Sequence, residues 1–293
     1  FTTMISQQRA ALKWGFSTPV YAFFVIARRI LQYPILFGWY LLRLTLFFRR
    51  SDFDRLMVVN GGYPASLLGR CAVIAWHLAG KKSKAIMNFH NSSTNSPWYF
   101  KFVEYLIDIW VINSVAQIVT VSRNCLDSLN ERAAFRDCGK GTYILNGIDD
   151  PLIDPKVVNK LSRDTNLKAP YCLMLATYEK RKGHRYLLEA FSLVVKHFPD
   201  IQLQIYGHGQ AHERKLVEDE VTAFKLKNHV HLNDFTEDKY GLIREAKMLL
   251  VPSQSHESFG LTIIEAMAFG VQVVVTDVGG MPEVLLNSQA GYV

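Results

Sequence analysis

The sequence has few of the residues that hold small or repetitive folds together. It contains 4 cysteines, 18 glycines and 10 prolines in 293 residues, and the cysteines form no CxxC pair. This composition excludes a disulfide scaffold, a collagen-like repeat and a disordered chain. We therefore expect the four cysteines, Cys71, Cys125, Cys138 and Cys172, to be buried thiols.

The first 50 residues lack aspartate and glutamate altogether. They hold seven basic residues and 12 aromatic residues, whereas the rest of the chain carries 26 bases and 26 acids. The longest uncharged runs, 14–27 and 30–42, are shorter than the roughly 18–20 residues of a spanning helix, and Pro19 and Pro34 are expected to interrupt them. This mixture favours a helix lying in the headgroup plane of an anionic membrane over a transmembrane span. The alternative is an apolar helix packed on the protein core with its bases in solvent.

From residue 54 onward, short apolar runs alternate with longer amphipathic stretches, and the pattern occurs twice. In the first half the expected strands are 56–59, 85–89, 118–121 and 142–145, and the expected helices are 64–78, 98–112 and 122–135. In the second half the expected strands are 171–175, 201–206, 230–232, 248–251 and 271–275, and the expected helices are 184–196, 211–224, 237–245 and 261–269. Apolar strands separated by helices imply parallel sheets covered on both faces. The expected fold class is α/β, with two doubly wound domains facing a cleft.

Composition divides the chain into four parts. Residues 1–50 are the basic, aromatic segment, 51–150 a first domain and 170–293 a second domain; 151–169 is polar, lacks periodicity and is expected to be a linker. Ligands of doubly wound sheets bind at the carboxyl ends of the strands, so functional residues are expected on the loops that follow strands.

The loop after the expected strand 248–251 carries two carboxylates. Glu257 and Glu265 have seven residues between them, and Gly260 lies between them just before an apolar helix. The free N–H groups of a helix N-terminus stabilise phosphate, and carboxylates accept hydrogen bonds from the vicinal hydroxyls of a sugar or ribose. For Glu265 a structural role is equally open, because Thr262 and Glu265 fit a capping box with Thr262 as the N-cap.

The segment Ser255-His-Glu-Ser-Phe-Gly-Leu-Thr-Ile-Ile-Glu265-Ala-Met-Ala-Phe-Gly270, followed by 274–283, resembles the retaining GT-B glycosyltransferases of the family-4 type, the glycosyl transferases group 1. Four shorter motifs extend the resemblance over roughly residues 54–293, in family order: Val119-Thr-Val-Ser122, Asn146-Gly-Ile-Asp149, Lys182-Gly183 and Ile205-Tyr-Gly-His-Gly209. The resemblance implies the GT-B fold of two Rossmann-like domains. Both domains are expected to be incomplete, because the first strand matches a later strand of the family and the chain stops before the family's last strand.

The resemblance also implies roles for single residues. The implied catalytic residues are Glu257, which contacts hydroxyls of the transferred sugar, His90, which reaches the sugar, and Lys182, which neutralises the diphosphate leaving group. The implied donor-binding residues are Arg181, Gly207, Ser258, Phe259, Gly260, Leu261, Thr262 and Glu265, the last of which binds the ribose. A structural histidine and a solvated loop lysine are the alternatives for His90 and Lys182.

The sequence departs from the family pattern in two places. Thr177 stands where the family usually has a second phosphate-binding arginine, and Arg181 is the candidate substitute. The Gly-rich loop with which the first domain of relatives approaches the donor has no counterpart at Asn60-Gly61-Gly62, which is expected to be a tight turn.

These features predict a retaining glycosyltransferase that moves a sugar from a nucleotide-diphosphate sugar to a hydroxyl acceptor. The segment 1–50 makes a lipid-linked or surface polysaccharide intermediate the favoured acceptor, and a cytoplasmic position, peripheral at the inner face of the cell membrane, the favoured location. No metal or other cofactor is expected to be required. The alternatives are a nucleotide-sugar 2-epimerase or phosphorylase of the same fold and a non-catalytic sugar-nucleotide-binding scaffold. A nucleic-acid-binding protein is disfavoured because residues 51–293 carry no net charge.

Overall fold

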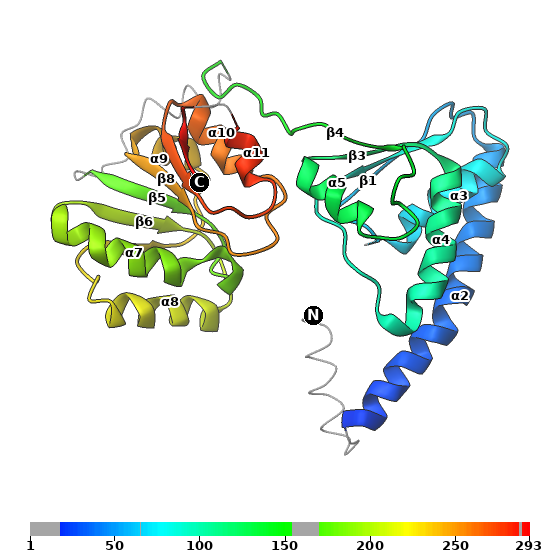
Figure 1. Ribbon diagram of the computed structural model, residues 1–293, viewed down its shortest axis with the longest axis horizontal. Coiled ribbons are helices and arrows are strands. Elements are labelled where there is room, and N and C mark those ends of the chain that lie inside the picture. The colour runs from blue at the N-terminus through cyan, green and yellow to red at the C-terminus, as the bar shows by residue number, and fades with distance from the viewer. Residues whose placement is uncertain (1–17, 65, 154–169, 287–288) are drawn as a thin grey trace. The chain divides into compact units, whose positions relative to one another are not determined.

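The computed structural model describes residues 18–64, 66–153, 170–286 and 289–293, and within 18–32 it describes the backbone only. Its contacts divide the chain into two compact units (Figure 1). The first comprises the residues up to 60 together with 64–88 and 96–117, and the second comprises 61–63, 89–95 and 118–293. The predicted linker, 151–169, lies from residue 154 onward outside the described residues.

The basic, aromatic segment forms one long helix, α2 (Thr18–Arg50), and Pro34 lies inside it. The predicted interruption is wrong for two reasons. Pro19 occupies the first turn, where a proline removes no intrahelical hydrogen bond. Next to Pro34 the helix is held by packing: the Tyr33 hydroxyl donates to Glu104 at 3.2 Å, and the Tyr33 ring packs on Phe100 with centroids 4.9 Å apart. Across the described residues, no helix combines the length and the apolar character that crossing a bilayer requires.

A four-stranded sheet with the order β1-β2-β3-β4 follows α2. Its strands are β1 (Met57–Asn60), β2 (Ala85–Phe89), β3 (Val115–Thr120) and β4 (Gly141–Tyr143), and its helices are α3 (Leu67–Leu78), the short η1 (Trp98–Phe100), α4 (Lys101–Ser114) and α5 (Arg123–Asn130). Ser66 and Ser122 cap α3 and α5 by accepting from backbone amides three residues later. The predicted helix 122–135 therefore starts as expected but ends earlier, where turns begin.

A six-stranded sheet lies in the second unit, with the order β10-β9-β8-β5-β6-β7 and every neighbouring pair parallel. The strands are β5 (Tyr171–Leu175), β6 (Gln202–Tyr206), β7 (Val230–Asn233), β8 (Met248–Val251), β9 (Gln272–Val275) and β10 (Gly291–Tyr292). The helices are η2 (Lys180–Lys182), α7 (His184–His197), α8 (Ala211–Ala223), α9 (Lys239–Glu245), α10 (Leu261–Ala268) and α11 (Met281–Leu285). The predicted strands and helices are present, whereas the short elements α11 and β10 were not predicted.

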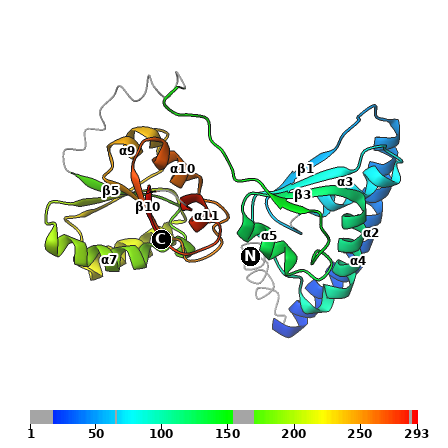
Figure 2. The same cartoon turned by 45° about the horizontal axis from the view of Figure 1, so that its top comes forward.

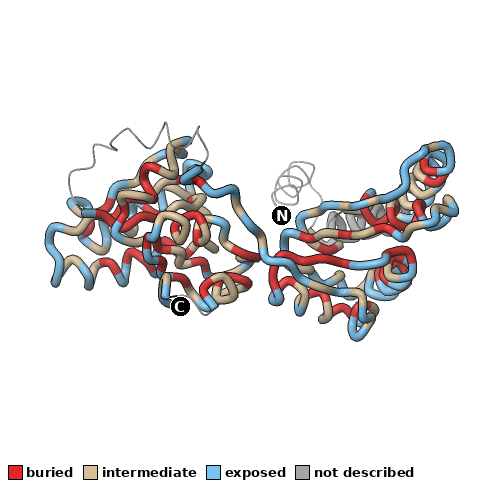
Figure 3. The backbone as a smooth tube through the Cα atoms, turned by 90° about the horizontal axis from the view of Figure 1, so that it is seen from above, coloured by how far each residue is buried: buried red, intermediate tan, exposed pale blue. Residues whose placement is uncertain are grey.

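Two cores cover the two faces of this sheet. Leu173 of β5 packs in one with residues of α9, α10 and α11, and its neighbours Cys172 and Met174 pack in the other with residues of α7 and α8. This alternation follows from the two-residue period of a strand. Figure 1 shows α7 on one side of the sheet and α10 and α11 on the other, and Figure 3 shows the buried interior in red. The α/β class with doubly wound parallel sheets is thus confirmed.

The cysteines are free thiols, as predicted. Cys71, Cys125 and Cys172 are buried, whereas Cys138 is only partly buried, so the expectation of burial fails for that residue. Burial raises the pKa of Cys71 and of Cys172 to about 11, which keeps both side chains protonated at neutral pH.

Candidate active site

The strand order of the six-stranded sheet determines where a ligand can bind. The order reverses between β5 and β8, which lie side by side although they are far apart in sequence. The loops that follow them diverge at the carboxyl edge and leave the crevice in which doubly wound sheets bind ligands. The two loops are tied together by a hydrogen bond of 2.7 Å from the Gln254 amide to the Arg181 carbonyl. The site is therefore built from the loops after β5 and β8.

Gly183 sets how closely these loops approach. Its φ is +80°, and a β-carbon at this position would lie 1.9 Å from the Pro252 carbonyl oxygen. Any other residue would be strained and would push the loops apart. The glycine thus fixes the preceding Lys182 against the second loop.

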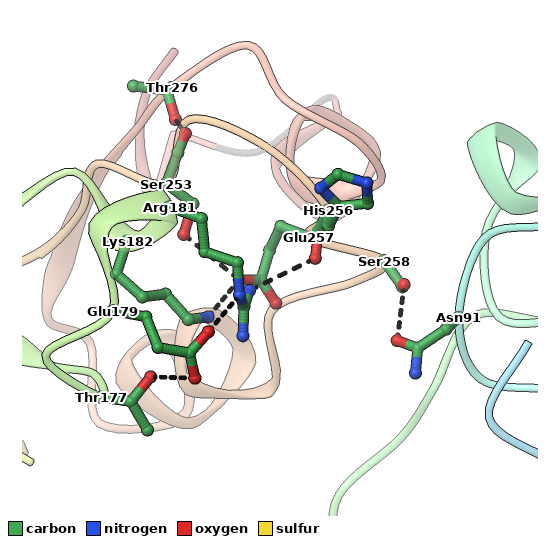
Figure 4. Close-up of polar contacts among 10 residues, drawn as sticks. All are labelled: Asn91, Thr177, Glu179, Arg181, Lys182, Ser253, His256, Glu257, Ser258 and Thr276. Atoms are coloured by element: carbon green, nitrogen blue, oxygen red, sulfur yellow. Dashed lines mark hydrogen bonds and ion pairs between the residues drawn. The ribbon is translucent and has the colours of Figure 1, made fainter. Parts of the chain in front are cut away.

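Lys182 and Glu257 form an ion pair across these loops (Figure 4). The Lys182 Nζ donates to Glu257 Oε2 at 2.6 Å, and the Ser253 hydroxyl donates to the same oxygen at 3.2 Å. The two charged side chains are only 17% and 16% exposed. No hydrogen bond to Glu257 Oε1 is found among the described residues, so this oxygen is available to a hydroxyl group of a ligand.

A cavity of about 330 Å³ adjoins the pair, within the second unit. Its lining includes eight of the predicted site residues: His90, Lys182, Glu257, Ser258, Phe259, Gly260, Leu261 and Thr262. The fold thus brings all three predicted catalytic residues to one cavity. In the described part of the chain, no three His, Cys, Asp or Glu side chains gather closely enough to hold a metal ion.

The N-terminus of α10 opens onto the cavity. Gly260 is the residue before the helix, with a φ of +88°, and Leu261 is the first helical residue. The alternative that Thr262 and Glu265 form a capping box is therefore excluded: Thr262 lies inside the first turn, so its side chain cannot cap the helix as an N-cap would. The Ile263 amide donates to the Gly260 carbonyl at 2.9 Å, and without a side-chain cap the amides of Leu261 and Thr262 keep their hydrogen-bonding capacity and attract an anion.

Three predicted donor-binding residues, Arg181, Gly207 and Glu265, do not line the cavity. Gly207 follows β6 and approaches the backbone of the β5 loop, where a β-carbon would lie 1.8 Å from the Ala176 carbonyl oxygen. Its evident role is to let these two backbones meet. A contact between Gly207 and a bound donor stays a prediction.

Glu265 is held inside the protein, with 4% of its surface exposed. Its Oε1 accepts from the Lys239 Nζ at 2.7 Å, and its Oε2 has no hydrogen-bond partner among the described residues. A buried carboxylate oxygen without a partner is costly. Because Glu265 does not line the cavity, its predicted contact with the ribose stays a prediction.

Arg181 lies beside the cavity rather than in it. Its Nε donates to Glu179 Oε2 at 2.6 Å, and the Thr177 hydroxyl donates to Glu179 Oε1 at 2.9 Å (Figure 4). Burial acts to raise the pKa of Glu179, but the hydrogen bonds from Arg181 and Thr177 outweigh it and lower that pKa. Glu179 thus connects two residues. One is Thr177, which stands where the family usually has an arginine, and the other is Arg181, the candidate substitute for that arginine.

If Arg181 supplies the second phosphate-binding cation, Arg181→Ala is expected to weaken donor binding about tenfold, since one charge-assisted contact is lost. Thr177→Arg in that background is expected to restore part of the affinity. Titration calorimetry with nucleoside diphosphates measures both, and unchanged affinity in Arg181→Ala would exclude the substitution.

The sequence patterns did not predict several residues of the site. Ser253, 1% exposed, orients Glu257; Asn91 and Asn146 line the cavity, and the Asn91 side-chain oxygen accepts from the Ser258 hydroxyl at 2.9 Å. The Gly280 amide donates to the Glu257 carbonyl at 3.0 Å. Asn146 and Gly280 belong to motifs already noted in the sequence, whereas no local signal marks Ser253.

His184, the first residue of α7, is buried directly after the Lys182-Gly183 turn, and its ring stacks on Tyr178 with centroids 5.5 Å apart. Burial, together with the positive charge of Lys182, lowers the pKa of His184 to about 4. In the unfolded chain the pKa of this histidine is near 6.5. Between about pH 4 and pH 6.5 the unfolded chain therefore binds a proton at His184 and the folded chain does not. Stability is lost as the pH falls through this window.

We expect the protonation of His184 to lower the free energy of unfolding by about 2 kcal/mol as the pH falls from 8 to 5. His184→Phe keeps a ring against Tyr178 without a titrating group, so its stability should fall less over that range. Denaturant unfolding at several pH values measures the difference, with the exposed His197→Phe of the same helix as the control. Equal pH slopes for wild type and His184→Phe would contradict the assignment.

The class of the fold follows from this architecture and from its comparison with solved structures. The chain superimposes on a glycosyltransferase from Rickettsia africae ESF-5 with a TM-score of 0.69 at 22% identity, over 88% of this chain and 67% of that one. It superimposes on Anabaena Alr3699/HepE, solved in complex with UDP, with a TM-score of 0.66 at 19% identity, over 86% and 67%. The fold is that of the GT-B glycosyltransferases.

Sequence comparison defines the family. Residues 159–293 match the family described as glycosyl transferases group 1. The chain is 36% identical over 249 residues to a phosphatidyl-myo-inositol mannosyltransferase of Mycolicibacterium smegmatis, covering 82% of this chain and 58% of the relative. It is 34% identical over 147 residues to the poly(glycerol-phosphate) alpha-glucosyltransferase of Bacillus subtilis, covering 50% and 20%. Residues 159–293 thus share the sequence pattern of the glycosyl transferases of group 1, and the chain spans less than two thirds of the length of either relative.

Proposed function

We propose that the protein is a retaining glycosyltransferase that moves a sugar from a nucleotide-diphosphate sugar to a hydroxyl acceptor. The observation that carries the proposal is the Lys182–Glu257 pair, 2.6 Å long, beside a cavity that also receives the N-terminus of α10. A cation and free helix amides match a diphosphate, and a carboxylate oxygen matches the hydroxyls of the sugar attached to it.

In this proposal each group acts on a different part of the donor. Lys182 and the amides of α10 stabilise the negative charge that grows on the diphosphate as its bond to the anomeric carbon breaks. Glu257 and His90 hold the sugar, and Glu265 holds the ribose. The acceptor oxygen bonds to the anomeric carbon on the face that the diphosphate leaves, and its proton passes to the departing phosphate oxygen. Configuration is thereby retained.

The names of the relatives support the two substrate classes. Anabaena Alr3699/HepE has been solved with UDP and with UDP-glucose, which are donor-type ligands. The two enzymes similar in sequence are named for phosphatidyl-myo-inositol and for poly(glycerol-phosphate), a lipid and a polymer. A lipid-linked or surface polysaccharide intermediate is therefore the proposed acceptor of this protein.

The proposed location is peripheral, at the inner face of the cell membrane. α2 carries basic residues without any acid, which attracts an anionic lipid surface. At this location the active site and the nucleotide-sugar donor are expected on the same, cytoplasmic side of the membrane.

The test follows nucleoside diphosphate release by the protein from a panel of nucleotide sugars, with and without membrane lipid extracts. We expect release that depends on the acceptor and a product with the donor's anomeric configuration, read from the anomeric proton coupling. An inverted product would exclude retention, and conversion of the donor without any acceptor would favour the epimerase alternative.

A further inference from the structure

Helix α4 exposes large apolar side chains and buries its charges. Its two acidic residues are buried beside Ile107 and Val111, with Glu104 5% and Asp108 3% exposed, whereas Phe102 is 73% exposed and Trp98, in the preceding η1, is 82% exposed. Amphipathic helices of soluble proteins bury their apolar stripe and expose their charges. Glu104 is fixed inward by Arg70, whose Nη1 donates to it at 2.7 Å. The apolar outer face is thus imposed by a buried ion pair.

Its neighbour α2 presents a similar outer face. The exposed apolar residues of α2 recur at helical spacing: Ile35, Leu36, Trp39, Leu42, Leu46 and Phe47. Aromatic rings join α2 to both elements: the ring centroids of Phe37 and Trp110, in α4, lie 6.2 Å apart, and those of Tyr33 and Phe100, in η1, lie 4.9 Å apart. Figures 1 and 2 both show α2 and α4 running side by side. The exposed apolar residues of both helices and of η1 therefore form one surface, which we term the α2–α4 face.

The charges on this face have one sign. Among the described residues, the exposed charged side chains of α2 and α4 are Arg43, Arg49, Arg50 and Lys101. Arg43 and Arg50 line a hollow of about 490 Å³ together with the apolar Leu46 and Phe47. The hollow thus combines two guanidinium groups with an apolar floor, which suits a phosphate headgroup above acyl chains.

We propose that the α2–α4 face docks on an anionic bilayer, with the aromatic residues of η1 and α4 entering the interface and Arg43 and Arg50 contacting lipid phosphates. The inference deepens the membrane partner of the proposed function and adds α4, which neither the charge pattern nor the relatives point to. A second copy of the chain fits less well, because two such faces would bring basic residues together without exposed acids to pair with them. A bilayer supplies both the apolar layer and the opposite charge.

The test is co-sedimentation of the full chain with vesicles of phosphatidylcholine alone or of phosphatidylcholine and phosphatidylglycerol in equal parts. We expect binding to the anionic vesicles, weakened by salt, and a loss of about tenfold in the variant Trp98→Ser with Phe102→Ser. Because both side chains are exposed, the variant should fold. The matched control, Leu193→Ser with Leu216→Ser, removes two exposed apolar residues of α7 and α8 and should bind as wild type.

Arg43→Gln with Arg50→Gln should lower binding to anionic vesicles and leave weak, salt-insensitive binding. Wild-type vesicle binding by Trp98→Ser with Phe102→Ser would overturn the role of α4. The protein could instead fail to bind vesicles and self-associate, with Trp98→Ser plus Phe102→Ser abolishing the self-association. That result would assign the face to a second copy of the chain and would also overturn the proposal. Glu257→Ala should bind vesicles normally, so failure of the transferase assignment and failure of this inference are separable.

Discussion

Replacing Glu257 with glutamine is expected to lower kcat by about 10²–10³-fold while leaving the KM for the donor unchanged or lower. Glutamine keeps the shape of the side chain but loses its negative charge. In the wild type, this carboxylate accepts hydrogen bonds from the Lys182 Nζ at 2.6 Å and from the Ser253 hydroxyl at 3.2 Å. Lys182 then has no carboxylate to neutralise it, so it binds the ground-state diphosphate at least as well. Only the stabilisation of the sugar in the transition state is lost.

The measurement is initial rates of nucleoside diphosphate release over a range of donor concentrations. Glu189→Gln is a suitable control, because it makes the same chemical change at an exposed position of α7. A rate equal to that of the wild type in Glu257→Gln would end the assignment of this site. An increase in KM with kcat unchanged would make Glu257 a binding residue rather than a catalytic one.

Lys182→Ala is expected to lower kcat by a similar factor, about 10²–10³-fold, and to raise the donor KM as well. The two parameters move together because the ammonium group contacts the diphosphate both before and during bond cleavage. Lys180→Ala, in the same turn but exposed, should behave as the wild type.

The double variant Lys182→Ala with Glu257→Gln separates two explanations. If the residues act on different parts of the donor, their effects should be close to additive; if Lys182 serves only to orient Glu257, the double variant should be no worse than the worse single variant. Thermal denaturation should show less destabilisation in the double variant than in either single variant, because each single variant leaves one largely buried charge without its partner.

Local patterns in the sequence were sufficient for most of the second unit. The apolar runs at β5 (Tyr171–Leu175) and β8 (Met248–Val251) have the boundaries that they were predicted to have, because buried parallel strands need near-continuous apolar residues. The helix at 261–268 and the two carboxylates around Gly260 could likewise be read from spacing. These features depend on residues within one or two turns of each other.

Predictions failed where a distant contact outweighed a local preference. Thr262 and Glu265 fit a capping box, yet Glu265 pairs with Lys239, which lies on a different helix. Pro34 predicts a break, yet α2 continues through it because the helix packs on the rest of the first unit. A local pattern cannot predict which side chain a residue will meet when the partner comes from another element.

The sequence by itself determined the class of fold, the family and the residue types of the site, since these rest on short-range periodicity and on motif spacing. Only the tertiary structure decided that Lys182 meets Glu257, 75 residues away in sequence, that Ser253 orients it, and that α4 turns its carboxylates inward. The physical reason is that these contacts depend on strand order and on helix packing. Both are set by the burial of the whole chain rather than by any one segment.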